Sequence, residues 1–174
     1  MTRAKKSKAK SRSDRPLIVT GWQVFAHPLL LDQLDKLIAT VQAEKKKHPQ
    51  TFQSAANTKV LAALNDLIFK TIPNDPSRKE YRHGGTLGEE YRHWFRAKFG
   101  NGRFRLFFRY SSSMKVIVFA WVNDETTLRQ YGARTDAYAV FGRMLEKGDP
   151  PDDWDALLKA AKSAQGRLGK AGKR

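Results

Sequence analysis

The stretch of sequence that decides the fold is residues 94–122, which reads WFRAKFGNGRFRLFFRYSSSMKVIVFAWV. It contains two arms in which charged and apolar residues alternate, joined by the turn Phe99-Gly100-Asn101-Gly102. Glycine and asparagine tolerate the positive φ angles that a tight hairpin needs. The apolar run Val116–Val122 follows and extends the sheet. The stretch therefore predicts a β-hairpin that leads into a further strand.

One face of this hairpin is cationic. Successive side chains of a strand point to opposite faces, so the charged residues of each arm share a face. They are Arg96 and Lys98 on the first arm, and Arg103, Arg105 and Arg109 on the second. Leu106 and Phe108 alternate with the arginines and are expected in the core, whereas Phe107 shares the arginine face and could stack on a base. Fixed charges on a rigid sheet suit a phosphodiester, although such a row can also be only a solvated strand face.

Apolar spacing predicts further elements on both sides of the hairpin. A first strand over 19–25 is expected to lead into a helix that begins at Pro28 and ends near Lys45–Lys47, just before His48-Pro49. A second helix over about 54–72 is expected to stop before Pro73, and the two helices form an αα-hairpin against the sheet. After the sheet, Thr135 or Asp136 can cap a helix that stops at Gly148, and Pro150-Pro151-Asp152 opens a last helix.

The positive charge of the chain is unevenly distributed. The formal net charge of +16 on 174 residues is typical of a nucleic-acid-binding protein. Residues 1–15 hold seven Lys or Arg and one Asp, and residues 159–174 hold six and no acid. We therefore expect a disordered basic arm over 1–15, a single domain over 16–164 and a disordered basic tail over 165–174. Within the domain, residues 78–109 carry nine Lys or Arg against three Glu, which concentrates the charge on the hairpin.

Composition excludes several classes of protein. The absence of cysteine excludes disulfides, a thiolate nucleophile and Cys-containing zinc sites. The run Val116–Val122 is far shorter than the ~20 residues that span a bilayer, and residues 16–22 are too short for the apolar part of a signal peptide. The acidic and amide residues at 123–125 are more typical of a turn than of a metal site. We expect a cytoplasmic protein that needs no metal or other cofactor and has no membrane partner.

Several motifs carry a resemblance to a known family. They are Gly21-Trp22, Ala26-His27-Pro28, Tyr81-Arg82-His83-Gly84, Leu87-Gly88, Trp94, the run 96–111, the run 115–125, Thr127-Leu128-Arg129, Tyr131-Gly132, Thr135-Asp136-Ala137-Tyr138 and the run 148–154. With these motifs the chain resembles the YhaV toxin family over about residues 20–155. The two basic tails lie outside the resemblance.

The resemblance implies a fold, an activity and partners. The fold would be α+β and RelE-like, with an N-terminal αα-hairpin packed on a mainly antiparallel twisted sheet and with C-terminal helices. The activity would be that of a type II toxin, an endoribonuclease (mRNA interferase) that cuts mRNA in association with ribosomes. A PrlF-like antitoxin would silence it, and operator DNA would be bound only through the complex with that antitoxin.

The resemblance also implies which residues act on RNA. The two basic residues of the family's middle strand match Arg96 and Lys98, and its arginine after an aromatic residue matches Arg105 after Phe104. Its later arginine and C-terminal tyrosine fall near Arg129 and Tyr131.

Chemistry supports this assignment without the family. RNA can cleave itself when its 2′-OH attacks the adjacent phosphate, so an enzyme must orient the chain, stabilise negative charge and move two protons. Arg105 is the expected phosphate clamp, because its planar guanidinium group stays charged. Arg96 and Lys98 would share the charge stabilisation, and Lys98, Tyr131 or His93 could move protons.

Further RNA contacts are expected at Arg92, Arg103, Phe107 and Arg109, and no metal is required. The alternative is a noncatalytic module that binds RNA or the ribosome with the same cationic sheet.

Overall fold

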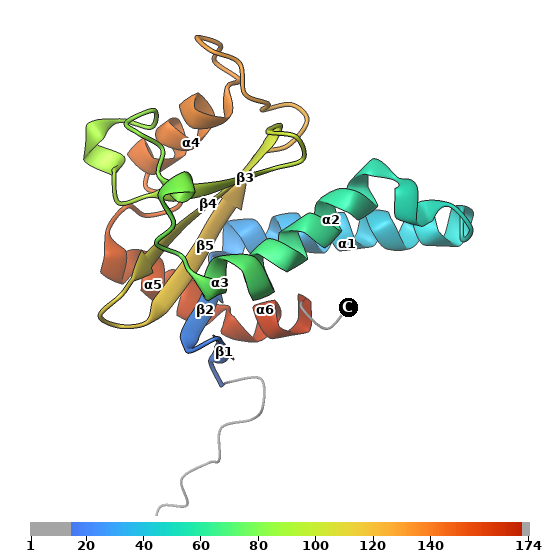
Figure 1. The fold of residues 1–174 in the computed structure, drawn as a ribbon, viewed down its shortest axis with the longest axis horizontal. Coiled ribbons are helices and arrows are strands. Elements are labelled where there is room, and N and C mark those ends of the chain that lie inside the picture. Colours follow the sequence, from blue (N-terminus) through green and yellow to red (C-terminus); the bar gives the residue numbers. More distant parts are fainter. Residues whose placement is uncertain (1–14, 172–174) are drawn as a thin grey trace, which may run out of the picture.

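A five-stranded sheet with the strand order β1-β2-β5-β4-β3 runs through the middle of the molecule (Figure 1). The computed structural model describes residues 15–171. The strands are β1 Leu17–Val19, β2 Trp22–Ala26, β3 Phe95–Phe99, β4 Phe104–Ser111 and β5 Val116–Val122. All neighbouring strands are antiparallel except β2 and β5, which are parallel. The sheet is therefore mainly antiparallel, and the protein belongs to the α+β class.

The predicted hairpin is confirmed as β3 and β4. Gly100, Asn101 and Gly102 have φ angles of 60°, 56° and 77°, so three consecutive residues between the two strands are in the left-handed region. A Cβ atom on Gly100 would lie 2.8 Å from the ring of Phe104, which makes glycine necessary there for a second reason. The predicted strand at 116–122 is confirmed as β5, which is buried along its whole length.

The predicted first strand over 19–25 is wrong as a single strand. Thr20 (φ 47°) and Gly21 (φ 85°) reverse the chain and divide this segment into the end of β1 and most of β2. The two short strands pair with Val19 opposite Trp22. The Thr20 hydroxyl donates a hydrogen bond to the carbonyl of Pro73 at 2.7 Å. This bond connects the turn to the short helix Ile72–Asn74.

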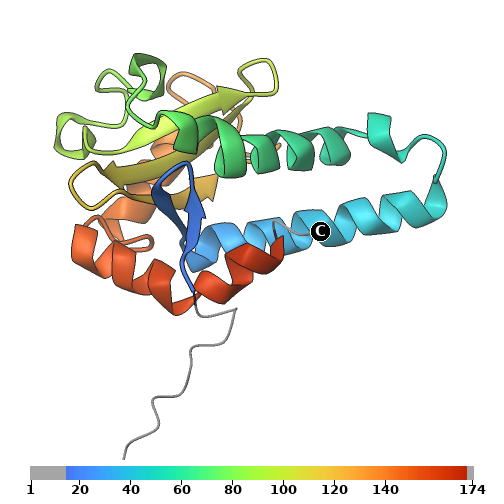
Figure 2. The same ribbon diagram turned by 60° about the horizontal axis from the view of Figure 1, so that its bottom comes forward.

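Two long helical segments lie on one side of the sheet and extend beyond it (Figure 2). The first is α1 Pro28–Lys47, which has the predicted bounds; the Nδ1 atom of His27 accepts a hydrogen bond from the amide of Leu29 and caps it. The second consists of α2 Ala56–Asp66, the π-helical turn Leu67–Thr71 and the short α3 Ile72–Asn74, with the 3-10 turn Phe52–Ser54 before it.

The second helix was predicted to stop before Pro73, but it continues to Asn74. Proline has no N–H group, and its ring crowds the preceding turn of a regular α-helix. Here the preceding turn is π-helical, with the amide of Ile72 bonded to the carbonyl of Leu67. The wider turn is where the helix accommodates the proline.

The other side of the sheet is covered by α4 Ala137–Glu146 and α5 Trp154–Ser163 (Figure 1). Asp136 caps α4, as predicted, and Gly148 lies just after its end. Asp153 caps α5. The sheet is therefore the middle of three layers, and each face has its own core. Trp94, Phe107, Phe141 and Leu157 belong to the core under α4 and α5, whereas Leu34, Ile68, Phe108 and Phe119 belong to the core under α1 and α2.

The C-terminal segment is helical, whereas a disordered tail was expected over residues 165–174. Gln165–Ala171 forms α6, which lies beside α1 (Figure 2). Leu168 is buried, and Arg167 pairs with Asp32 and Asp35 at 2.8 Å each. Most of the predicted basic arm, residues 1–14, and the end of the predicted tail, residues 172–174, lie outside the described residues. None of the helices in residues 15–171 has the length and apolarity that crossing a bilayer requires.

Candidate active site

Two arginines from neighbouring strands meet at one tyrosine hydroxyl. The Nε atom of Arg96 on β3 donates a hydrogen bond to the Tyr138 hydroxyl at 2.8 Å, and the Nε atom of Arg105 on β4 donates to the same oxygen at 3.1 Å. Tyr138 is in the first turn of α4, which packs on this face of the sheet. The Arg105 guanidinium also lies 5.4 Å from the centre of the Tyr138 ring. This convergence of positive charge is the centre of the candidate site.

The two arginines are buried, whereas the sequence predicted a cationic face of the sheet. Arg96 and Arg105 are only 8% and 6% exposed, because α4 covers this face of the sheet. Arg96 also donates to the carbonyl of Glu80 at 2.6 Å, and Arg105 donates to the carbonyl of Gly102 at 2.8 Å. These contacts hold both guanidinium groups in fixed positions, as a preorganised anion site requires.

Asn123 positions the strand that carries Arg105. Its side-chain oxygen accepts a hydrogen bond from the Arg105 amide, and its side-chain nitrogen donates to the carbonyls of Arg103 at 3.0 Å and Thr127 at 3.1 Å. Asp124, the next residue, accepts hydrogen bonds from the amide and hydroxyl of Thr126. The predicted turn after β5 is thus confirmed.

Arg129 and Tyr131 join the same site from the segment between β5 and α4. Arg129 lies 4.8 Å from the centre of the Tyr138 ring and 3.7 Å from that of Tyr131. It also pairs with Asp136 at 2.6 Å. Burial alone would raise the pKa of Asp136, but hydrogen bonds from Arg129 and the Gln130 amide outweigh it and hold this pKa below its usual range. A largely buried ion pair therefore connects the cap of α4 to the site.

Two hollows adjoin residues of this cluster. One of about 480 Å³ is lined by Arg96, Lys98 and residues 78–82, and Lys98 is exposed at its rim. The other, of about 380 Å³, is lined by Arg129, Tyr131 and Tyr138. Tyr131 is 88% exposed, so its hydroxyl is accessible to a bound ligand. The structure therefore brings together five of the six predicted catalytic residues.

His93 is the sixth, and the structure places it elsewhere. It lies just before β3, five residues from Lys98, or about 16 Å along an extended chain. Its Nε2 atom lies 2.6 Å from a carboxylate oxygen of Asp152, which also accepts a hydrogen bond from the indole of Trp94 at 2.8 Å. His93 thus links β3 to the start of α5 and is not part of the arginine cluster.

The predicted RNA contacts are dispersed. Arg109 donates to the carbonyl of Asp152 and lies between the rings of Trp94 and Trp154, where burial lowers its pKa. Arg103 precedes β4 instead of lying on it and pairs with Glu125 at 2.6 Å.

Arg92 pairs with Glu89 on an exposed turn. Phe107 is 1% exposed and stacks on Phe141, with ring centres 4.2 Å apart. The expectation that Phe107 stacks on a base is therefore wrong, because α4 covers its ring.

Sequence reasoning missed Tyr138 as a functional residue. The residue occurs in a motif of the family resemblance, but an aromatic residue at the start of an amphipathic helix is usually a core residue. Its hydroxyl meets Arg96 and Arg105 across 42 and 33 residues of sequence, and only the fold brings them together. Among residues 15–171, no group of three His, Asp or Glu side chains is arranged to hold a metal ion.

The fold and the site define a basic α+β protein in which three arginines from different segments converge on one tyrosine. A family profile described as "toxin with endonuclease activity, of toxin-antitoxin system" matches residues 24–162. The chain therefore belongs to this family, the YhaV toxins.

Named relatives agree with this family. A protein named toxin YhaV from Escherichia coli O6:H1 is 48% identical over 147 residues, which are 84% of this chain and 96% of the relative. A protein named ribonuclease toxin YhaV from Escherichia coli K12 has the same identity and coverage. No solved structure gives a significant match to the chain.

Proposed function

We propose that this protein is an endoribonuclease toxin that cleaves mRNA at the arginine cluster of Arg96, Arg105 and Arg129 around Tyr138. The observation that carries the proposal is the convergence of Arg96 and Arg105 on the Tyr138 hydroxyl. A fixed pair of guanidinium groups can hold the phosphate and stabilise the extra negative charge of the transition state. The name of the ribonuclease toxin relative agrees with RNA as the substrate.

Cleavage would proceed by attack of the 2′-OH on the adjacent phosphate. In this mechanism Arg105 clamps the phosphate, and Arg96 and Arg129 share the charge stabilisation. Lys98 and Tyr131, both exposed at the rims of the two hollows, are the groups that can reach the 2′-OH or the leaving 5′-oxygen to move protons. The guanidinium groups supply the charge stabilisation, so we propose a metal-independent reaction.

The finer fold and the partners belong to the same proposal. The helical segments packed beside a mainly antiparallel sheet support a RelE-like fold with an N-terminal αα-hairpin. The family description supports a cognate antitoxin, which we propose to be PrlF-like and to be required for any contact with operator DNA. We further propose that the toxin acts on mRNA in the cytoplasm, in association with ribosomes.

The test of this function is 5′-end mapping of a defined mRNA incubated with the purified protein. One arm contains translating ribosomes, and a second, ribosome-free arm contains EDTA, because ribosomes need Mg²⁺. We expect new 5′ ends that are absent with Arg105→Ala, and upstream fragments that end in a 2′,3′-cyclic phosphate. New ends in the EDTA arm would support a metal-independent reaction on free RNA. The absence of new ends in every arm would refute the nuclease assignment.

A further inference from the structure

A row of aromatic side chains crosses the sheet on the face opposite to the arginine cluster. Phe95 of β3, Tyr110 of β4 and Trp22 of β2 are each half-buried, and we call them the aromatic platform. The ring centres of Phe95 and Tyr110 are 4.8 Å apart, and those of Tyr110 and Trp22 are 6.0 Å apart. The rings pack against the edge of the core under α1 and α2, and part of each remains open to solvent.

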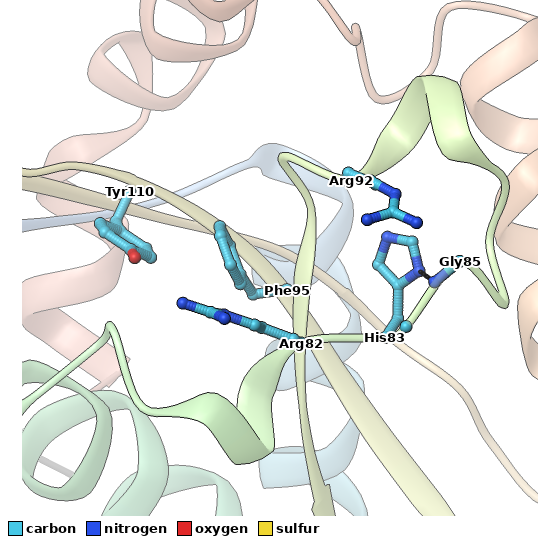
Figure 3. Close-up of a pocket in the computed structure, with 7 residues that line it drawn as sticks. Arg82, His83, Gly85, Arg92, Phe95 and Tyr110 are labelled. Atoms are coloured by element: carbon cyan, nitrogen blue, oxygen red, sulfur yellow. Dashed lines mark hydrogen bonds between the residues drawn. The ribbon is translucent and has the colours of Figure 1, made fainter.

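Cationic side chains lie at both ends of the aromatic platform. The ammonium group of Lys115 lies 4.7 Å from the centre of the Trp22 ring. At the other end, the guanidinium group of Arg82 lies beside Phe95 and points toward Tyr110 (Figure 3). Both cations are exposed, and within residues 15–171 the Arg82 side chain makes no hydrogen bond or ion pair. Arg82 is therefore free to bind an anion.

The loop that carries Arg82 is held in a fixed shape by His83. The buried imidazole of His83 accepts hydrogen bonds at Nδ1 from the amides of Gly85 and Leu87, at 3.2 and 3.3 Å, and its Nε2 atom donates to the carbonyl of Tyr91 at 2.8 Å. Arg82, His83, Gly85, Arg92, Phe95 and Tyr110 line a hollow of about 310 Å³, shown in Figure 3. This volume is at the lower end of the ~300–1,000 Å³ that ligand pockets occupy.

Arg82 also connects the aromatic platform to the arginine cluster. It lines the 310 Å³ hollow with Phe95 and Tyr110, and it lines the 480 Å³ hollow with Arg96 and Lys98. The connection runs over β3, which is the edge strand of the sheet. A single-stranded chain of phosphates could thus pass from the arginine cluster over this edge, with Arg82 on its path.

We propose that the aromatic platform is a second RNA-binding surface, on which unpaired bases of single-stranded RNA stack while Arg82 and Lys115 bind phosphates. Proteins that bind single strands combine aromatic rings as stacking surfaces with flanking cations in this way. The proposal rests on the proposed function in that RNA is the substrate. It deepens that function, because the platform binds RNA away from the bond that is cut.

The probe is a 2′-O-methyl oligouridine of about twelve nucleotides, a length within the range that single-strand sites cover. Its blocked 2′-oxygens prevent self-cleavage, so binding is measured without the nuclease reaction. Fluorescence anisotropy of the labelled strand gives its affinity for the full chain. We expect Tyr110→Leu to weaken binding about tenfold, the effect of one stacked base, whereas Tyr110→Phe keeps the ring and the affinity.

Charge variants test the phosphate contacts. Arg82→Ala should weaken binding and reduce its salt dependence by about one phosphate contact, and Arg82→Lys should restore much of the loss. Lys46→Ala, an exposed cation on α1, is the matched control and should bind like the parent. Thermal unfolding of each variant verifies that it is folded.

Photo-crosslinking with 4-thiouridine in the same strand gives a second readout. We expect adducts on peptides that contain Trp22, Phe95 or Tyr110. The proposal is overturned if Tyr110→Leu and Arg82→Ala bind the strand like the parent, or if these variants lose affinity only for the cognate antitoxin. Because the strand cannot be cleaved, loss of platform binding and loss of nuclease activity are separate results: either can fail while the other stands.

Discussion

Replacing Tyr138 by phenylalanine removes the oxygen on which two arginines depend. In the parent, the Nε atoms of Arg96 and Arg105 both donate to this hydroxyl, and both arginine residues are more than nine-tenths buried. A buried donor that loses its acceptor costs about 1–3 kcal/mol. Because both arginines keep their carbonyl contacts and Arg96 lines a hollow that admits water, we expect a total loss of about 2–4 kcal/mol in the free energy of unfolding.

Urea denaturation measures this loss directly, and thermal unfolding should show a decrease of roughly 4–16 °C for a chain of this size. Catalysis should fall by about ten- to a hundredfold in kcat with little change in KM, because Tyr138 positions the arginines without binding RNA itself. Tyr131→Phe is the matched control for stability, since that side chain is 88% exposed and its loss should change stability by less than about 0.5 kcal/mol. A Tyr138→Phe protein as stable and as active as the parent would refute the view that the hydroxyl holds the two guanidinium groups.

Other predictions test the surroundings of the site. Asp136→Asn should cost about 3 kcal/mol at neutral pH, because Arg129 loses its largely buried partner. Since the pairing lowers the folded-state pKa of Asp136, this contribution is complete above the unfolded pKa of about 3.9 and is lost as the pH falls through the folded-state value, which urea denaturation across pH can follow. Phe107→Leu should lower stability by about 1–3 kcal/mol and leave the RNA affinity of the folded protein unchanged; a selective loss of affinity in anisotropy would show that the ring meets a base. Asp152→Ala should cost about 1–3 kcal/mol in denaturation, because the buried Trp94 indole loses its acceptor, and parent-like stability would contradict this role.

The elements that could be predicted from the sequence are those with a local chemical cause. The hairpin follows from the glycines and asparagine of its turn, and α1 begins where His27 caps it and Pro28 takes the first helical position. Asp136 and Gly148 likewise mark the two ends of α4. In each case the residue that sets the boundary acts within a few positions of itself.

The features that escaped prediction depend on distant contacts or on a local exception. Gln165–Ala171 contains two glycines and two cationic residues, yet Leu168 packs into the core under α1 and α2, and so a helix forms there. Pro73 remains helical because a π-turn precedes it. The site itself was predictable in its cations but not in its centre, since Tyr138 and the degree of burial of the arginines depend on where α4 lies on the sheet.

The measurement that tests the central claim most directly compares single-turnover cleavage with RNA binding for Arg105→Ala. Arg103→Ala, which removes an exposed arginine two positions away, is the control. If the cluster around Tyr138 is an active site, Arg105→Ala should reduce the cleavage rate at least about a hundredfold and weaken binding by less than about tenfold. Arg103→Ala should change both only slightly. Equal losses of cleavage and binding in Arg105→Ala, or unchanged cleavage, would contradict the account and favour a noncatalytic RNA-binding surface.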